Sequence, residues 1–257
     1  MTPEKTPPLE RYLAVLETVG TAGEGLTLSE IAERCVLPVG TAHRLLQNLH
    51  RAGLVTGAGG KRKDYRLGER LLRLLHAGSD TASLKIAVQP ILDALADELA
   101  ETCFLTRLVG HQVISLAWAV PAKGLQGYVF PGHIMPPHAA ASAKALLAFQ
   151  SPDVVRRALA GKLPKLTPKT KVKRSLVEHE YAAVRASGYA TCWDEMDVGL
   201  AALAVPVPVQ GIGIMYSLGL SGLIDRLTRR PEQELVKRLQ VAAEALGRAL
   251  RDRGTDM

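Results

Sequence analysis

Apolar residues recur at helical spacing in three short runs near the start of the chain, which predicts three helices. The second run opens with Thr27-Leu28-Ser29-Glu30, a capping-box pattern in which Thr27 caps the helix and Glu30 bonds back to it. The third run extends from about Gly40 to Arg51, and Gly53 is placed to terminate it. The first run should end at Gly20 and comprises Leu9, Tyr12, Leu13, Leu16 and Val19.

The third predicted helix has two contrasting faces. One is an apolar stripe of Ala42, Leu45, Leu46 and Leu49. The other is small or polar, with Gly40, Thr41, His43, Arg44, Gln47, Asn48 and Arg51. Arginine suits guanine edges, Gln and Asn suit adenine, and Thr suits a thymine methyl group. On a lone helix this face would indicate only exposure to solvent, but the second helix, the short turn and the third helix have helix-turn-helix spacing, which favours DNA binding.

A basic hairpin follows the third helix. Strands are expected at 54–56 and 65–67, and Lys61-Arg62-Lys63 lies in the loop between them beside two glycines. Such a loop is typical of the wing of a winged helix, where the basic side chains contact phosphates. The alternative is a charge cluster that is only solvated.

The remaining two-thirds of the chain alternates between strand and helix patterns. Helices are expected at 84–102, 138–150, 152–160, 174–187 and 231–251, and strands at 103–109, 113–118, 127–130, 189–193, 200–207 and 212–218. This order predicts an α+β domain with a mostly antiparallel sheet. We therefore expect an N-terminal winged helix-turn-helix at 1–68, a linker helix at 69–80 and a second domain at 81–257.

Composition adds limits to this picture. The 257 residues are 47% apolar and carry a net charge of +7, which favours an anionic partner without identifying it. The three cysteines are odd in number and widely spaced, which argues against a disulfide framework. Neither a signal-peptide pattern nor an apolar stretch of membrane-spanning length is present, so the sequence predicts a cytoplasmic protein with no membrane partner.

Several motifs together resemble the isocitrate lyase regulator (IclR) family along nearly the whole chain. In the first third they are Leu28-Ser29-Glu30-Ile31-Ala32, Thr41 to Leu49, Gly53-Leu54-Val55 and Tyr65-Arg66-Leu67-Gly68, followed by a leucine-rich linker at 69–75. In the rest they are Gly132, Pro136-Pro137-His138-Ala139, Lys144 to Ala148, Arg185 to Tyr189, Asp194-Glu195, Gly199-Leu200 and Ala204 to Val207. The resemblance implies a DNA-binding transcription regulator whose GAF-like α+β domain binds a small organic effector. It also implies a symmetric homodimer or homotetramer on a pseudo-palindromic operator, more often as a repressor than as an activator, with no cofactor.

The expected DNA-contacting residues are Thr27, Ser29, Gly40, Thr41, His43, Arg44, Gln47, Asn48, Lys61, Arg62, Lys63 and Tyr65. The resemblance places the effector between the sheet and the start of the helix at His138, where the amides of Ala141 and Ser142 suit a carboxylate. Where some members that bind very small acids have Asp, Cys and two Ser, an ungapped reading places Cys192, Ala202, Tyr216 and Leu218 in this chain. Trp118, Tyr128, Trp193 and Met215 lie on nearby predicted strands and would make the site larger and less polar. This predicts an aromatic or hydrophobic carboxylate, although each residue alone is better explained as core, and a one-residue slip would move a strand residue to the other face.

Other classes of protein remain as alternatives. An enzyme is disfavoured because Ser142 and Lys144 point to different helix faces and no nucleophile elbow or Walker-type loop occurs. The His and Cys residues are too scattered for a metal site. A regulator of the same family that responds to a small aliphatic keto- or hydroxy-acid stays open, and so does a DNA-binding protein that responds to no effector.

Overall fold

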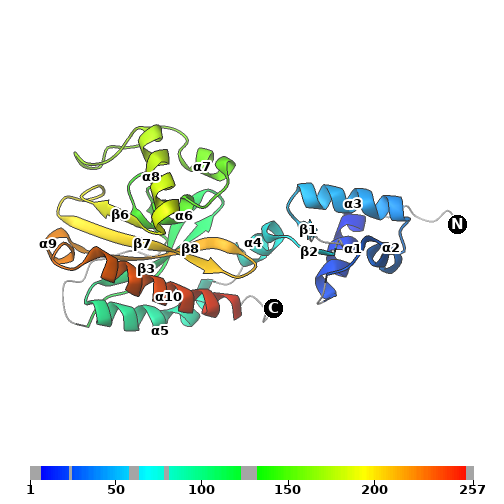
Figure 1. Cartoon of the computed structure of the whole chain (residues 1–257), viewed down its shortest axis with the longest axis horizontal. Coiled ribbons are helices and arrows are strands. Elements are labelled where there is room, and N and C mark those ends of the chain that lie inside the picture. The colour runs from blue at the N-terminus through cyan, green and yellow to red at the C-terminus, as the bar shows by residue number, and fades with distance from the viewer. Residues whose placement is uncertain (1–6, 23–24, 58–63, 78–80, 123–131, 253–257) are drawn as a thin grey trace. The chain divides into compact units, whose positions relative to one another are not determined.

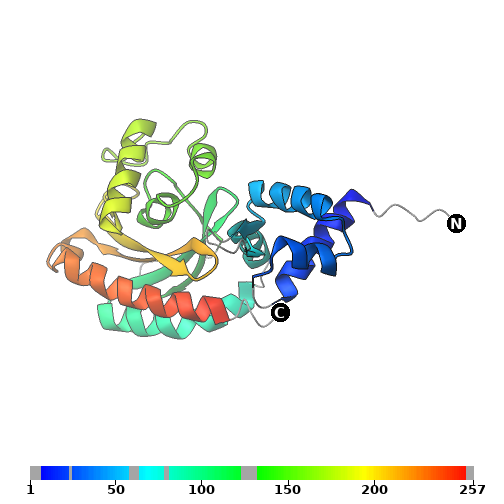
Figure 2. The same ribbon diagram turned by 45° about the vertical axis from the view of Figure 1, so that its right-hand side comes forward.

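The computed structural model describes residues 7–22, 25–57, 64–77, 81–122 and 132–252, and the chain divides into two compact units, Met1–Gly78 and Ser79–Met257 (Figures 1 and 2). Lys61, Arg62, Lys63 and Tyr128 lie outside the described residues, and so does the strand expected at 127–130. The N-terminal unit contains α1 Pro8–Thr21, α2 Leu28–Arg34, α3 Val39–Arg51, β1 Val55–Gly57, β2 Tyr65–Leu67 and α4 Glu69–Ala77.

A small apolar core holds the first three helices against the β1–β2 hairpin. Val15, Ile31 and Leu46 are fully buried in it. The strands pair antiparallel, with Val55 opposite Leu67. This arrangement of three helices and a two-stranded hairpin is the winged helix-turn-helix that the apolar spacing predicted.

Gly20 does not end α1, contrary to the sequence-based expectation. The helix continues to Thr21, and Gly20 lies in its last turn. A Cβ atom at this position would come within 3.3 Å of Leu67 Cδ1 on β2. The glycine therefore permits close packing between α1 and the hairpin.

The C-terminal unit is built around a six-stranded sheet with strand order β5-β4-β3-β8-β7-β6, in which all described pairings are antiparallel. Its strands are β3 Thr102–Val109, β4 Gln112–Ala119, β5 Ile134–Met135, β6 Ala190–Trp193, β7 Leu200–Val209 and β8 Gly213–Leu223. Its helices are α5 Thr81–Leu99, α6 Ala141–Leu147, α7 Pro152–Ala158, α8 Arg174–Ser187, α9 Ile224–Leu227 and α10 Glu232–Asp252. The long helices α5 and α10 cover one face, and α6 and α8 lie over the other (Figure 1). The α+β class and the mostly antiparallel sheet agree with the sequence analysis.

Some elements differ from their expected bounds. The helix expected from His138 begins only at Ala141, because residues 136–140 form a largely buried turn in which a ring nitrogen of His138 lies 2.8 Å from the Pro164 carbonyl oxygen. The strand expected to end at Leu218 continues to Leu223, and β5 and α9 were not expected. The helix expected to reach Thr102 ends at Leu99, and Ala100 has φ +53° before β3 begins.

The capping box at the start of α2 predicts a measurable contribution to the stability of the domain. Thr27 Oγ accepts from Glu30 N, and Thr27 N donates to Glu30 Oε2 at 2.7 Å. Replacing Thr27 by Ala removes the side-chain half of this box and should lower the free energy of unfolding by about 1 kcal/mol in urea denaturation. Ser29→Ala, at an exposed position of the same helix, is the control and should change it by less than about 0.5 kcal/mol. Equal losses in both variants would contradict the capping role.

Candidate functional site

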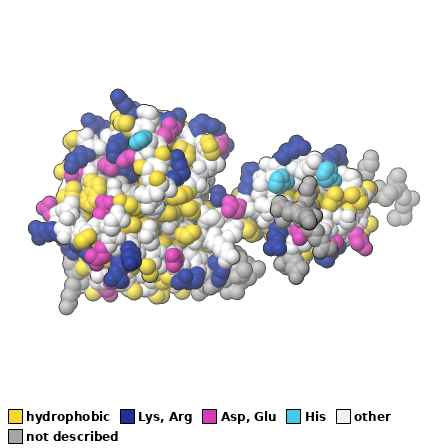
Figure 3. Space-filling model, viewed as in Figure 1, with side chains coloured by type: hydrophobic (Ala, Val, Ile, Leu, Met, Phe, Trp, Pro, Cys, Tyr) yellow, Lys and Arg dark blue, Asp and Glu magenta, His cyan; other side chains and the backbone are white. Residues whose placement is uncertain are grey.

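The exposed face of α3 carries the side chains expected to contact DNA. His43, Arg44 and Gln47 are exposed, while Ala42, Leu45, Leu46 and Leu49 are buried. Lys, Arg and His side chains gather on the N-terminal unit over the side that carries α3 (Figure 3). Within the described residues, Arg44 has no hydrogen bond or ion pair, so its five N–H donors are available to an external partner. Gln47 lies 3.4 Å from His43 between their Nε2 atoms, which restricts both side chains before any partner arrives.

Three of the expected DNA contacts are already engaged within the domain. Asn48 Nδ2 donates to the hydroxyl oxygen of Tyr12 on α1 at 2.7 Å. Thr27 Oγ lies 2.7 Å from Glu30 Oε2 as well as capping α2. Tyr65 is half-buried against the core of the domain, and its backbone bridges to Leu26. These side chains hold the domain together, which leaves Ser29, Gly40, Thr41, His43, Arg44 and Gln47 without these structural bonds.

In the C-terminal unit, strand pairing places three small side chains in a row on the face beneath α6. Cys192 on β6 pairs with Ala202 on β7, and Ala202 pairs with Ser221 on β8. Because directly paired residues point to the same side of a sheet, this row forms the floor of a cavity.

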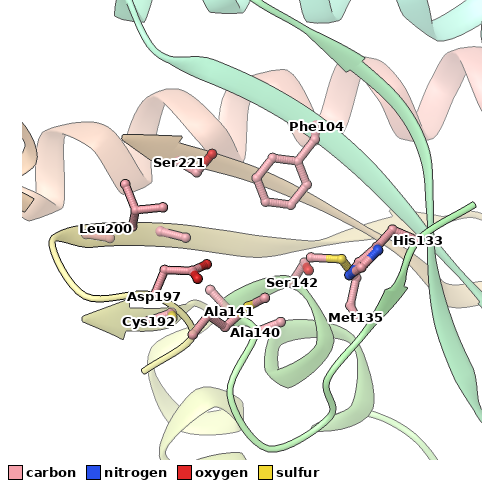
Figure 4. A pocket seen from close by; sticks show the side chains of 13 residues that line it. Phe104, His133, Met135, Ala140, Ala141, Ser142, Cys192, Asp197, Leu200 and Ser221 are labelled. Carbon is pink, nitrogen blue, oxygen red and sulfur yellow. The ribbon is translucent and has the colours of Figure 1, made fainter. Parts of the chain in front are cut away.

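The neighbouring row contains Phe104, Gly219 and Ala204. A Cβ atom at Gly219 would lie 2.6 Å from Phe104 Cζ, so the missing side chain lets the aromatic ring lie flat across the strand. The Phe104 ring thereby reaches the cavity and forms part of its wall (Figure 4).

Hydrogen bonds fix the start of α6 against this floor. Ser217 Oγ donates to the carbonyl oxygen of Ser142 at 2.8 Å. Thr106 Oγ1 lies 2.6 Å from Ser217 Oγ and is therefore the donor in that contact. The hydroxyl of Ser142 itself is fully buried, lines the cavity and has no partner among the described residues. The first internal amide bond of the helix is Lys144 N to Ala140 O, so the amides of Ala141 and Ser142 precede it.

The loop between β6 and β7 closes the cavity on another side, and ion pairs hold it. Lys144 Nζ lies 2.9 Å from Glu195 Oε1, and their side chains are only 2% and 6% exposed. Lys169 Nζ contacts Asp194 Oδ2 at 2.7 Å, and the Gly199 amide donates to Asp194 Oδ1 at 2.6 Å. These bonds, with the lysine foremost, hold the pKa of Asp194 below its usual value. The bonds of Asp194 and Glu195 thus fix the position of the loop, and the next two residues, Met196 and Asp197, line the cavity.

The cavity encloses about 220 Å³ and is mostly apolar. Its side chains come from β3, β5, α6, β6, β7, β8 and the flanking loops: Phe104, His133, Met135, Ala140, Ala141, Ser142, Cys192, Met196, Asp197, Leu200, Ala201, Ala202 and Ser221 (Figure 4). None of these lining residues is Lys or Arg. Burial raises the pKa of the Cys192 thiol, which stays protonated at neutral pH and is a poor nucleophile.

Four of the positions expected from sequence, Ala141, Ser142, Cys192 and Ala202, line this cavity. Tyr216 and Leu218 do not, because their strand partners Val207 and Val205 lie on the face covered by α5 and α10. The ungapped reading slips by one residue on β8, and Ser217, Gly219 and Ser221 occupy the cavity face instead. Trp118 packs into the core beneath α6, and neither it nor Trp193 or Met215 lines the cavity.

Sequence reasoning missed Phe104, Met135, Met196, Asp197 and Ser221. Only the pairing of Ser221 with Ala202 reveals that both share a face. The loop residues Met196 and Asp197 follow directly after the Asp194-Glu195 pair, and this proximity was the one available signal.

Metal-binding clusters and membrane-spanning helices are absent from the part of the chain that is described. No cluster of three His, Cys, Asp or Glu side chains suited to a metal ion occurs there. No helix in the described ranges has both the length and the apolarity to cross a membrane.

The buried ion pair predicts a measurable loss of stability. Glu195→Gln leaves the ammonium of Lys144 with Glu180, 3.5 Å away, as its remaining anionic partner. We expect the free energy of unfolding in urea to fall by about 2–4 kcal/mol, because the buried ammonium loses the nearer of its two carboxylate partners. Glu178→Gln, on the exposed side of α8, should change it by less than about 0.5 kcal/mol. If the two variants are equally stable, the pair does not hold the loop.

Comparison with known proteins extends over both units. The model of the bacterial transcriptional regulator IclR C-terminal domain matches residues 77–248, and that of the IclR helix-turn-helix domain matches residues 8–58. The HTH-type transcriptional regulator TtgV of Pseudomonas putida is 32% identical over 248 residues, covering 94% of this chain and 92% of that protein. The DNA-binding transcriptional repressor YiaJ of Escherichia coli is 28% identical, covering 94% of this chain and 87% of its own.

A solved structure shares the fold along the chain. It is that of an IclR homolog from Microbacterium hydrocarbonoxydans complexed with 4-hydroxybenzoate, with a TM-score of 0.60 and 24% identity, covering 95% of this chain and 99% of that one. These relatives are regulators of transcription rather than enzymes. The chain therefore belongs to the IclR family of bacterial transcriptional regulators.

Proposed function

We propose that this regulator is a cytoplasmic repressor of a catabolic operon, and that an aromatic or otherwise hydrophobic carboxylate controls its affinity for the operator. The observation that carries the effector is the buried hydroxyl of Ser142, unpartnered among the described residues, in a mostly apolar cavity. A buried polar group without a partner is costly, so a ligand that bonds it is stabilised by the relief of that cost. The repressor role is supported by the similarity to YiaJ.

The size of the cavity favours a single ring. A cavity of about 150 Å³ is enough to hold benzene, and this one has about 220 Å³. The ring of Phe104 and the thioethers of Met135 and Met196 offer contacts to an aromatic ligand. The acid group would lie at the start of α6, where the Ser142 hydroxyl and the amides of Ala141 and Ser142 are donors.

For DNA binding we propose that residues 1–68 form the reading domain, that residues 69–80 form the linker, and that residues 81–257 bind effector and form the oligomer. A symmetric dimer or tetramer then places two α3 helices on a pseudo-palindromic operator. Arg44 and Gln47 read base edges, and the hairpin tip and the start of α2 contact phosphates. The effector changes operator affinity through the linker helix.

The DNA-reading role predicts a specific result for Arg44→Ala. Operator duplexes are first recovered by selection from random DNA with the full-length protein, and affinities are then measured by fluorescence anisotropy. Arg44→Ala should weaken binding by about 1–3 kcal/mol and relax the preference at one base pair of each half-site. Arg34→Ala is the control, because it removes the same charge from an exposed position in the last turn of α2, outside the proposed base contacts, and should leave the base preference unchanged. An unchanged base preference in Arg44→Ala would remove this residue from the reading face.

The effector is tested by thermal denaturation of the full-length protein with benzoate, 4-hydroxybenzoate, pyruvate and glyoxylate. A ligand at one hundred times its Kd adds about 2.7 kcal/mol of stability, and a true effector also changes operator affinity. We expect stabilisation by the aromatic acids alone. Tight binding of pyruvate or glyoxylate without the aromatic acids would instead favour an effector of the small aliphatic class. If no acid alters stability or operator affinity, the effector proposal fails while the DNA-binding role is unaffected.

A further inference from the structure

Val39 is an exposed apolar residue at the start of α3. It is 54% exposed, and it is not among the described residues that pack against the core of the N-terminal unit. Next to it, a Cβ atom at Gly40 would have no heavy atom within 4 Å, so the surface around this end of the helix is open. The packing of the domain therefore does not explain why a branched apolar side chain stands here.

The helical repeat places Val39 in a row with two polar residues. Residues four apart lie one above the other on the same face of a helix, so Val39, His43 and Gln47 share one face of α3. The distance of 3.4 Å between the Nε2 atoms of His43 and Gln47 shows that neighbouring members of this row are in contact. All three residues are exposed, and Val39 ends the row in the first turn of the helix. The row thus offers one apolar side chain followed by two that form hydrogen bonds.

The major groove of DNA holds an apolar group that suits this position. In a helix-turn-helix, the N-terminal residues of the recognition helix contact the base edges, and Val39 is the first residue of α3. Of the four bases, only thymine presents a methyl group in the major groove. Contact between this methyl group and the side chain of Val39 removes apolar surface of both from water, which favours thymine over a base that lacks the methyl group.

We propose that Val39 is a specificity-determining residue, which recognises the methyl group of one thymine in each half-site of the operator. This assignment rests on the proposed function, since it requires that α3 reads base edges. It deepens that function because Arg44 and Gln47 recognise bases through hydrogen bonds, whereas Val39 recognises a base through its apolar surface. The operator is then read by two kinds of contact from one helix.

The test removes the methyl group without changing the hydrogen bonds of the base pair. Operator duplexes selected with the full-length protein are prepared with each thymine of one half-site replaced in turn by deoxyuridine, which lacks only the methyl group. Affinities are measured by fluorescence anisotropy for the full-length wild type, Val39→Ala and Val39→Thr. Val241→Ala is the matched control, because it makes the same change at a position on α10 that is 63% exposed. Melting temperatures verify that each variant is folded.

At one thymine of the half-site, deoxyuridine should weaken binding by the wild type and by Val241→Ala about 3–10-fold, as expected for the loss of one apolar contact with a methyl group. Val39→Ala should bind the thymine operator more weakly by a similar factor, and at that position it should no longer distinguish thymine from deoxyuridine. Val39→Thr keeps the branched shape and one of the two methyl groups, so its preference should lie between. If the missing methyl group acted only through the flexibility of the DNA, the preference would persist in Val39→Ala.

Three results would overturn the assignment. The selected half-sites contain no preferred thymine, or the wild type binds every deoxyuridine duplex as tightly as the thymine operator, or the preference for thymine is unchanged in Val39→Ala. The last result would assign the methyl group to another residue, such as Thr41. A changed base preference in Arg44→Ala then shows that the base-reading role of α3 stands without Val39. If the full-length protein binds its selected duplexes no more tightly than random DNA, the proposed base reading and this inference fail together.

Discussion

The buried ion pair between Lys144 and Glu195 joins the two segments on which the cavity depends. One segment is α6, whose first residues line the cavity, and the other is the loop that precedes β7. Burying both charges costs several kcal/mol per ion, and this cost is offset only by close geometry and additional partners. Here the ammonium has a second carboxylate, Glu180, at 3.5 Å. The helix and the loop are thus joined by an interaction that is expensive to break, so a ligand that moves one of them moves the other.

The cavity also depends on residues that have almost no side chain. Gly219 allows the ring of Phe104 to cross β8, and the small side chains of Ala202 and Ala204 leave room between β7 and α6. A larger side chain at any of these three positions would fill the cavity or push α6 away from the sheet. The selectivity of the site is accordingly set by two things: the size of its floor, and the few polar groups around it that the fold leaves unpaired.

The N-terminal domain was largely predictable because its signals are local. The capping box at Thr27, the apolar stripe of α3 and the left-handed Gly53 each act within a few residues of sequence. The cavity was less predictable because its geometry is set by pairing between distant segments. Tyr216 and Leu218 were assigned to the wrong face, since only the pairing of β8 with β3 and β7 fixes which side a residue occupies. The start of α6 depends likewise on distant contacts, with His138 beside Pro164 and the hydroxyl of Tyr181 donating to the Pro137 carbonyl.

The bond from Asn48 to the hydroxyl of Tyr12 has a consequence for how recognition can change. It ties the reading helix to α1, and α1 supplies no residue to the reading face proposed above. The set of side chains that determine the operator is therefore wider than the set that touches it. A change at position 12 releases an amide on α3 and offers DNA a new donor and acceptor. A new operator preference can thus arise from a helix that contacts no base.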